Sequence, residues 1–470
     1  MSRHQRMSMV LQVRDKAYAP MAKDSASSVR YRLAGRRGFL QVSTLAAGSL
    51  AAASVLPTAL SEAATKRRAP KSAILFFLAG GPSHIDTYDM KPEQTAEIRG
   101  PFQACETSLP GLLLPEIMPA HHGLAKELAV VRSVTHHLSV HDDATHWLQT
   151  GYPLLNARAR GQSHPAMGAV VSKLQGPRQE GMPAYVCVPE DYRTHMGFYL
   201  GASYLRSRHQ ALNSGGDPSL GNYRPPEFML PKEISLPRLE DRQNLLRSLD
   251  RLAAQRDANV GYQDADDALT QAVELAGGPQ ARRAFDLEQE QPKTRDRYGR
   301  HAYGQGALLA RRLIEAGSSL VVINLYEKDV DWWDDHTTIE KNLRARLPRY
   351  DQAFCALVSD LAERGLLDNT LVASFGEFGR SPRIDKGAGR GHWPAAMSAV
   401  LTGGGVKSGQ IIGSTVADGS EPKDRPLSPG DLLASIYQVL GVDPQQSLTD
   451  SQGRPIPLLS SGLPIRELFA

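Results

Sequence analysis

Cysteine is scarce in this chain, with three residues among 470, and no two of them form a CxxC pair. This spacing excludes a dense disulfide framework and a zinc site built from paired thiolates. Cys105, Cys187 and Cys355 are expected to be small buried hydrophobic residues, although an oxidising compartment would allow one bridge. The chain also lacks a GxSxG motif, which argues against an esterase with a serine nucleophile elbow.

A broad basic surface is also missing from the main part of the chain. Residues 1–68 contain 12 Lys and Arg but only 3 Asp and Glu, whereas residues 69–470 contain 42 Lys and Arg against 47 Asp and Glu. The formal net charge of +4 therefore comes from the N-terminal segment. A mildly acidic body argues against a nucleic-acid partner.

The N-terminal segment has the pattern of an export signal. Arg36 and Arg37 precede Phe39 and an apolar stretch over residues 42–60, and small residues follow at 61–64. The paired arginines resemble the twin-arginine signal, a secretory type whose pathway exports folded proteins. We expect a periplasmic or secreted protein that uses the twin-arginine export machinery and keeps no stable membrane span after cleavage. A membrane anchor is the alternative, but Ala, Gly, Ser and Thr make the stretch weakly hydrophobic.

Short apolar runs alternate with helical patterns in the rest of the chain. Strands are expected at 73–78, 128–131, 184–188, 320–325, 370–375 and 398–401. Helices are expected at 306–316, 343–364 and 429–440, the last between a Ser428 cap and Gly441. This alternation predicts one α/β domain with a mainly parallel sheet covered on both faces, and with insertions at 189–230 and 240–290.

Carboxylates and imidazoles follow the expected strands, where ligands bind in open α/β sheets. They are Asp86, Asp334, His336, Glu377 and His392. Such a set suits a divalent cation, above all zinc, with manganese or calcium as alternatives. Each residue alone would more often be a turn residue, a helix cap or a packed loop residue.

Asp334, His336 and His392 are the strongest metal candidates. The two-residue spacing lets Asp334 and His336 reach one point from an extended loop. Glycines on either side of Arg390 allow the close backbone approach that His392 needs. Two imidazoles and one carboxylate leave a position open for water or substrate, as in catalytic zinc sites. We expect these three residues to bind one divalent cation.

The ordered motifs of the chain resemble the DUF1501 family. They are GGPSHIDTYDMKP at 80–92, WWDDH at 332–336, GEFGRSPRI at 376–384, GRGHWPAAMSAVLTGGG at 389–405 and LSPGDLLASIYQVLGVDP at 427–444. That family resembles the alkaline phosphatase and sulfatase superfamily, which uses metals to hydrolyse or transfer phosphate and sulfate esters. The resemblance implies a three-layer alkaline phosphatase-like fold over 69–470, after an N-terminal extension and signal at 1–68.

The resemblance also implies roles for individual residues. Asp86 stands where the superfamily has an aspartate after its first strand, and the three candidates above match a D/H/H metal site. Phe378 stands where the superfamily has a histidine, so only the carboxylate of Glu377 can be a ligand there, and a second metal is in doubt. The chain has no Cys-x-Pro-Ser-Arg motif, which excludes a formylglycine sulfatase.

The superfamily's nucleophile lies at a helix N-terminus shortly before a Thr-Gly turn, which Thr150 and the next residue resemble. Counting back, the resemblance places His141 at the nucleophile position, within a histidine cluster. His141 would then be a metal ligand, a general base or a nucleophile, with Thr145 or Ser139 as alternative attacking groups. The structural alternative is a cluster that only caps a helix and packs on Trp147.

Together these features predict an exported metal-dependent hydrolase of phosphate or sulfate esters, with an anionic small molecule or polysaccharide ester as substrate. Arg380 is expected to hold the anion through bidentate hydrogen bonds, unless it pairs with Asp385. Glu377 is expected to point into the same cavity as Asp86. The alternative is a secreted binding protein that keeps the fold and one metal, which the missing hydroxyl or thiol nucleophile favours.

Overall fold

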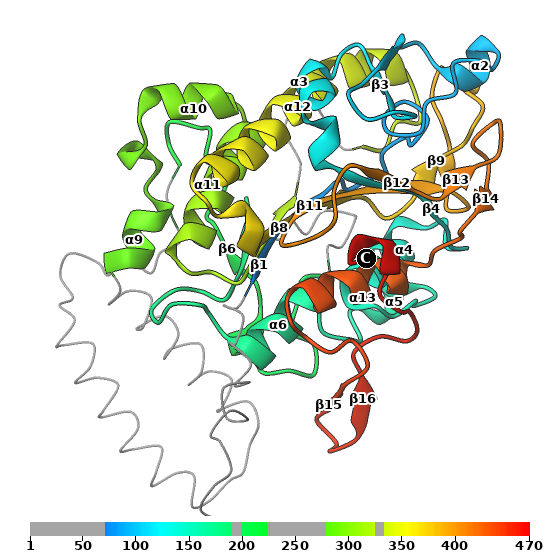
Figure 1. Cartoon of the computed structure of the whole chain (residues 1–470). Coiled ribbons are helices and arrows are strands. Elements are labelled where there is room, and N and C mark those ends of the chain that lie inside the picture. Colours follow the sequence, from blue (N-terminus) through cyan, green and yellow to red (C-terminus); the bar gives the residue numbers. More distant parts are fainter. Residues whose placement is uncertain (1–70, 190–198, 224, 226–278, 325–332) are drawn as a thin grey trace, which may run out of the picture. The chain divides into compact units, whose positions relative to one another are not determined.

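Strands with fully buried side chains form the centre of the fold. The structure is a computed structural model that describes residues 71–189, 199–223, 225, 279–324 and 333–470 (Figure 1). β1 (Ser72–Phe77) and β8 (Thr370–Phe375) are buried at every position, as expected of strands covered on both faces. β1 pairs in parallel with β8 on one side and with β7 (Leu320–Asn324) on the other.

Within the described residues, the central sheet has eight strands in the order β12-β4-β11-β8-β1-β7-β5-β6. The other members are β4 (Ala129–Val134), β5 (Tyr185–Val188), β6 (Leu212–Asn213), β11 (Met397–Gly403) and β12 (Gln410–Ile412). Only β11 is antiparallel to its neighbours in this sheet, β4 and β8. The predicted α/β class with a mainly parallel sheet is confirmed, and all six predicted strands are present.

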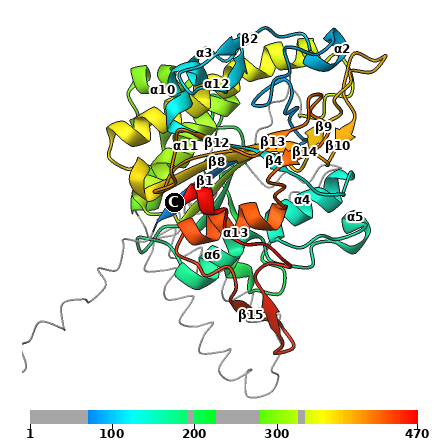
Figure 2. The same ribbon diagram turned by 45° about the vertical axis from the view of Figure 1, so that its right-hand side comes forward.

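Helices cover both faces of the sheet and complete three layers (Figure 2). One face packs against α11 (Ala302–Ala316) and α12 (Ile339–Glu363), and the other against α4 (His141–Thr150), α6 (Met167–Gln175) and α13 (Pro429–Val439). The three predicted helices correspond to α11, α12 and α13. Ser428 and Asp431 form a capping box at the start of α13, where the cap was expected.

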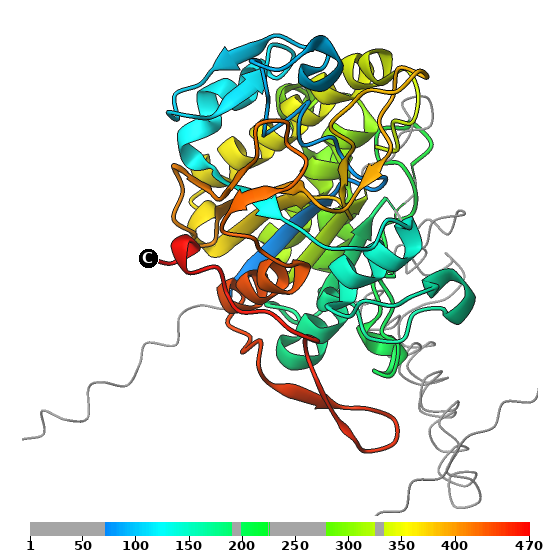
Figure 3. The same cartoon turned by 90° about the vertical axis from the view of Figure 1, so that its right-hand side faces the viewer.

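Shorter elements surround the layers. They are α2 (Ala96–Arg99), α3 (Pro119–Leu124), α5 (Ala157–Arg160), α9 (Pro279–Phe285), α10 (Pro292–Tyr298), and the strand pairs β2–β3 (Ala104–Glu106, Leu113–Pro115), β9–β10 (Gly379–Arg380, His392–Trp393), β13–β14 (Ser414–Thr415, Pro422–Asp424) and β15–β16 (Ser447–Thr449, Pro455–Pro457). The β15–β16 hairpin extends away from the sheet (Figure 3).

The carboxyl ends of β1, β4, β7 and β8 meet at one edge of the sheet. β11 starts from the same edge, because it is antiparallel to β8, and the β9–β10 hairpin precedes it. After β1, Gly80 has a φ of 107°, and a Cβ atom there would lie 2.6 Å from the backbone nitrogen of Asp334. Glycine therefore lets the β1 loop touch the loop that carries Asp334.

Several sequence predictions lie outside the described residues. These are the signal at 1–68, part of the insertion at 189–230 and most of the insertion at 240–290, so they stay predictions. The three cysteines are free, and Cys187 and Cys355 are buried as expected, while Cys105 is partly exposed. Among the described helices, none combines the length and the apolar character that crossing a membrane requires.

Candidate functional site

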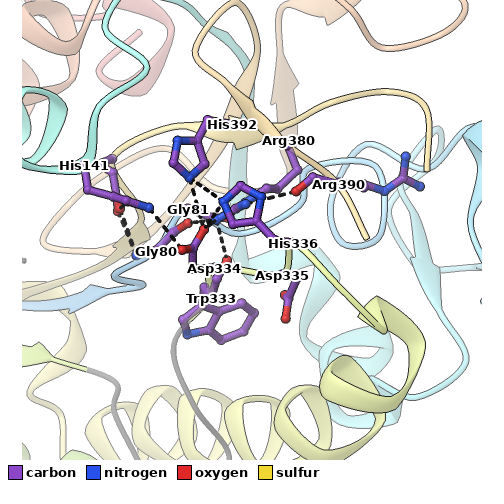
Figure 4. A network of polar contacts seen from close by, with 12 residues as sticks. Gly80, Gly81, His141, Trp333, Asp334, Asp335, His336, Arg380, Arg390 and His392 are labelled. Atoms are coloured by element: carbon purple, nitrogen blue, oxygen red, sulfur yellow. Dashed lines mark hydrogen bonds and ion pairs between the residues drawn. The ribbon is translucent and has the colours of Figure 1, made fainter. Parts of the chain in front are cut away.

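Loops at this edge of the sheet bring one carboxylate and three imidazoles together (Figure 4). Asp334 and His336 lie on the loop that leads into α12, His141 is the first residue of α4, and His392 begins β10. The α4 helix starts here because the extended Val140 ends the loop after β4. Three separate parts of the sequence therefore supply the cluster.

Asp334 is the centre of this cluster. Its Oδ2 atom lies 3.3 Å from His141 Nε2, and its Oδ1 atom lies 3.1 Å from Nε2 of both His392 and His336. The Nε2 atoms of His336 and His392 are 2.9 Å apart. Single ligand atoms of His141, Asp334 and His392 all lie within 4.8 Å of one another, so these residues form a candidate metal-ligand group.

Hydrogen bonds on the far side of two rings fix their orientation. His141 Nδ1 lies 2.6 Å from Glu377 Oε1, and His392 Nδ1 donates to the carbonyl oxygen of Ser139 at 2.8 Å. Both rings therefore turn Nε2 toward Asp334. His141 Nε2 is buried and faces Asp334 Oδ2 at 3.3 Å. This arrangement is typical of metal-binding histidines, whose second nitrogen is held by a carboxylate or a carbonyl.

The charges of the cluster balance without any outside group. Burial lowers the pKa of His141, but hydrogen bonds and charge from Asp334 and Glu377 outweigh it and raise the pKa to about 9. Burial raises the pKa of Asp334, yet hydrogen bonds from His141 and His392 and the charge of Arg380 bring it well below its usual range. The protonated His141 ring and the Arg380 guanidinium thus balance the carboxylates of Asp334 and Glu377, and a cation would take the place of one proton on His141.

Glu377 follows β8 as predicted, but its carboxylate lies behind His141. Its two oxygens accept the N–H of Gly80 at 2.9 and 3.1 Å, and one of them also faces His141 Nδ1. These contacts make Glu377 an acceptor that orients His141, and they do not support the predicted role as a direct ligand. No feature of the sequence distinguishes an orienting carboxylate from a ligating one.

Phe378 closes one side of the cluster with an apolar ring. It is fully buried, and its ring centroid lies 5.0 Å from that of His141 and 4.6 Å from that of His392. Gly81 lies directly against it, since a Cβ atom there would be 2.5 Å from the Phe378 ring. Phe378, which stands where the superfamily has a histidine, therefore fills this position with a packed apolar ring.

Asp86 requires a correction, because the structure places its carboxylate in a buried ion pair. Asp86 Oδ2 lies 2.7 Å from Arg390 Nε and 2.5 Å from Ser83 Oγ, and the residue is fully buried. Both carboxylate oxygens of Asp86 lie within hydrogen-bond distance of the Arg390 guanidinium. These contacts do not support the predicted metal role of Asp86, whereas the cavity that it was expected to share with Glu377 stays a prediction.

Arg380 requires a similar correction. Its side chain is fully buried, and its N–H groups donate to the carbonyl oxygens of Gly80, Gly81, Trp333 and Arg390 and to the carboxylate of Asp334. The predicted alternative partner, Asp385, is not among these acceptors. With its donors used inside the protein, Arg380 fixes the loops of the site, and the geometry does not support anion binding by it.

The remaining predicted residues lie on α4 and the loop before it. Thr145 is buried one turn into the helix, and Ser139 contributes its carbonyl oxygen to His392. The rings of His136 and His137 do pack on Trp147, with centroids 5.7 and 5.8 Å away. The packing alternative therefore describes His136 and His137, whereas His141 turns to Asp334.

The fold and this edge site define an α/β protein of the kind that binds ligands at the carboxyl ends of its strands. Residues 70–469 match the family model DUF1501, described as a protein of unknown function. The chain belongs to this family, as its motifs predicted. No protein with a curated description matches the sequence.

Several solved structures are similar to this chain. Ps i-CgsB shares 11% identity at a TM-score of 0.38, over 80% of this chain and 72% of that one. A protein in the alkaline phosphatase superfamily from Vibrio parahaemolyticus shares 13% at 0.35, over 79% and 67%. The phosphonate monoester hydrolase of Agrobacterium radiobacter shares 12% at 0.34, over 85% and 77%. At these identities the likeness identifies no substrate.

Proposed function

We propose that this protein is an exported metal-dependent hydrolase of phosphate or sulfate esters. The observation that carries the proposal is the convergence of His141 and His392 Nε2 on Asp334, since single ligand atoms of these three residues all lie within 4.8 Å of one another. A cation at this point would bind the Nε2 lone pairs of both rings and an oxygen of Asp334, and His141 would release a proton.

The donor set fits a divalent cation, and zinc first of all. Two imidazole nitrogens and one carboxylate oxygen are the ligands of catalytic zinc sites, which keep a further position for water or substrate. His141, Asp334 and His392 would hold the cation. The side chain of His336 is 49% exposed, so His336 stands on the open side, where a substrate enters.

When bound, the cation supplies Lewis-acid polarisation of an ester oxygen and lowers the pKa of water. The residues of the chain orient and shield the site. Glu377 keeps the proton of His141 on Nδ1, which leaves Nε2 for ligation, and the Ser139 carbonyl does the same for His392. Phe378 packs against the rings of His141 and His392 and shields one side of the site from water.

A metal analysis of the purified mature protein tests the cation site. We expect close to one equivalent of zinc in the wild type, and loss of that zinc in His141→Ala and His392→Ala. His137→Ala is the matched control, because His137 is exposed on the same loop and contacts Trp147 instead. Full zinc occupancy in both of the first two variants would refute the assignment.

A panel of phosphate and sulfate esters then separates the enzyme from a second candidate, a secreted binding protein. The second candidate is favoured by His141, which stands where the superfamily resemblance implies a hydroxyl or thiol nucleophile. Zinc-dependent turnover that His392→Ala abolishes supports the hydrolase. Bound zinc without turnover of any ester supports the binding protein.

Export by the twin-arginine pathway is the part of the proposal that rests on sequence alone. Replacing Arg36 and Arg37 by Lys should retain the protein in the cytoplasm, because that pathway reads the arginine pair. Mass spectrometry of the exported wild type should find a new N-terminus between residues 59 and 66. Normal export of the double variant would remove the twin-arginine assignment.

A further inference from the structure

Three residues that line one small cavity each have a buried polar atom without a hydrogen-bond partner among the described residues. These atoms are Trp333 Nε1, His84 Nδ1 and Ser398 Oγ. All three residues line a cavity with about 10 Å³ of space for a water-sized sphere, and the residues are 0%, 1% and 8% exposed. Buried polar atoms almost always have partners, so three unpaired atoms on one cavity indicate a common ligand.

The hydrogen-bonding capacities of the three atoms complement one another. His84 Nε2 lies 2.8 Å from the carbonyl oxygen of Gly419, which can only accept, so Nε2 carries the proton and Nδ1 is an acceptor. Burial lowers the pKa of His84, which keeps the ring neutral. The Trp333 indole can only donate, whereas the Ser398 hydroxyl can do both. The ligand must therefore both accept and donate.

The size of the cavity limits that ligand to one small molecule. A bound water needs roughly 10–15 Å³ of such space and two to four polar partners, which this cavity supplies. A bare cation would be repelled by the indole N–H, and an anion by the lone pair of His84. The hydroxyls of Tyr350 and Ser374 also line the cavity, but Tyr350 donates to Ser374 at 2.8 Å.

We propose that a single structural water molecule is bound in this cavity. It accepts a hydrogen bond from Trp333 Nε1, donates one to His84 Nδ1 and pairs with Ser398 Oγ. The site connects the loop after β1, the loop before α12 and the start of β11, which are distant in sequence.

The proposed water and the Asp334 cluster lie on opposite sides of the same loop. Trp333 and Asp334 are consecutive, and Figure 4 shows the indole pointing away from the histidines that Asp334 meets. The backbone N–H of Trp333 donates to Ala79 O at 2.9 Å. The water thus holds the Trp333 side chain, while the backbone bond holds the loop to β1. The proposal stands whether or not a cation binds at Asp334.

A high-resolution crystal structure of the mature protein tests the water directly. We expect a peak of density at about 2.7–3.2 Å from all three atoms, the range of ordinary hydrogen bonds. A cavity without density, or side chains turned so that the three atoms bond to protein groups, would overturn the proposal.

A pair of serine variants gives a second test through the thermal midpoint. Ser318 Oγ is also buried and without a partner, but Ser318 does not line the cavity. Ser398→Ala removes a bond to the water and should lower Tm by roughly 2 °C. Ser318→Ala removes only an unpaired hydroxyl and should leave Tm equal or higher. If Ser398→Ala also leaves Tm equal or higher, the cavity is dry and the proposal is wrong.

Discussion

The cluster around Asp334 and the cluster around Asp351 contain similar side chains in different surroundings. Each offers three ligand atoms within 4.8 Å, from His141, Asp334 and His392 in the first and from His121, Asp351 and Cys355 in the second. The first is partly exposed, whereas the second is fully buried. Comparing the two clusters shows that short distances between ligand atoms are not enough to make a candidate cation site.

The Asp351 cluster is satisfied by the protein itself. His121 Nδ1 lies 2.6 Å from Asp351, and His121 Nε2 lies 2.9 Å from the hydroxyl of Tyr88. The carboxylate of Asp351 also accepts the backbone N–H groups of Ala120 and His121. Those N–H groups would repel a cation, and both ring nitrogens are in use. The cluster therefore fastens α3 to α12, whereas the Asp334 cluster is partly exposed and turns the Nε2 atoms of its rings toward one carboxylate.

The largest expected effect is on stability, from His121→Ala. The substitution takes the imidazole away from the buried carboxylate of Asp351 and from the hydroxyl of Tyr88, and the loss of a buried hydrogen-bond partner typically costs about 1–3 kcal/mol. Urea unfolding should show this loss, while zinc content stays that of the wild type. His392→Ala should do the reverse, with zinc lost and the free energy of unfolding of the metal-free form little changed. Zinc loss in His121→Ala would contradict the claim that zinc binds at the Asp334 cluster and not at the Asp351 cluster.

Glu377→Gln should weaken zinc binding by about 10–100-fold, the usual effect of changing a group that orients a ligating histidine. Glutamine still offers an oxygen to Gly80, so the fold should survive. Zinc titration against a competing chelator measures the affinity, and circular dichroism checks the fold. Affinity equal to that of the wild type would show that Glu377 does not orient His141.

The affinity for zinc should rise about tenfold per pH unit between pH 7 and pH 9. Below the His141 pKa of about 9, binding must displace one proton held between Asp334 and Glu377. Because this pKa is raised from its ordinary 6.5, the proton stabilises the metal-free fold fully below pH 6.5 and stops doing so as the pH passes 9. Chelator competition from pH 7 to pH 10 measures the slope. An affinity independent of pH over this range contradicts the charge balance.

The smallest expected effect on zinc binding belongs to His336→Ala. The side chain of His336 is half exposed, although its Nε2 atom lies 3.1 Å from Asp334 Oδ1 and 2.9 Å from His392 Nε2. Zinc should remain bound in this variant, with a change of a few-fold at most, although the sequence alone predicted His336 as a ligand. Complete zinc loss in His336→Ala would show that His336 is a zinc ligand, as the sequence predicted.

Much of the fold follows from local sequence pattern. The runs that become β1 and β8 are apolar at every position, and Ser428 caps α13 where expected. The direction of β11 could not be predicted from the sequence pattern, because an apolar run looks the same for a parallel and an antiparallel strand. It is the β9–β10 hairpin before β11 that reverses the chain.

The site was predicted less completely than the fold. Asp334 and His392 follow recognisable loop positions, and they do meet. Asp86 and Arg380 were misassigned because their partners, Arg390 and a set of backbone carbonyls, come together only in three dimensions. Charged residues after strands thus predict where a site lies, but burial and pairing decide which of them face it.

Anomalous X-ray diffraction at the zinc edge, from crystals of the mature protein grown with zinc, tests the central claim most directly. The account predicts one peak about 2.0–2.2 Å from His141 Nε2, His392 Nε2 and an oxygen of Asp334. It predicts no peak among His121, Asp351 and Cys355. A zinc peak at that second cluster, or none at Asp334 in zinc-saturated crystals, would contradict it.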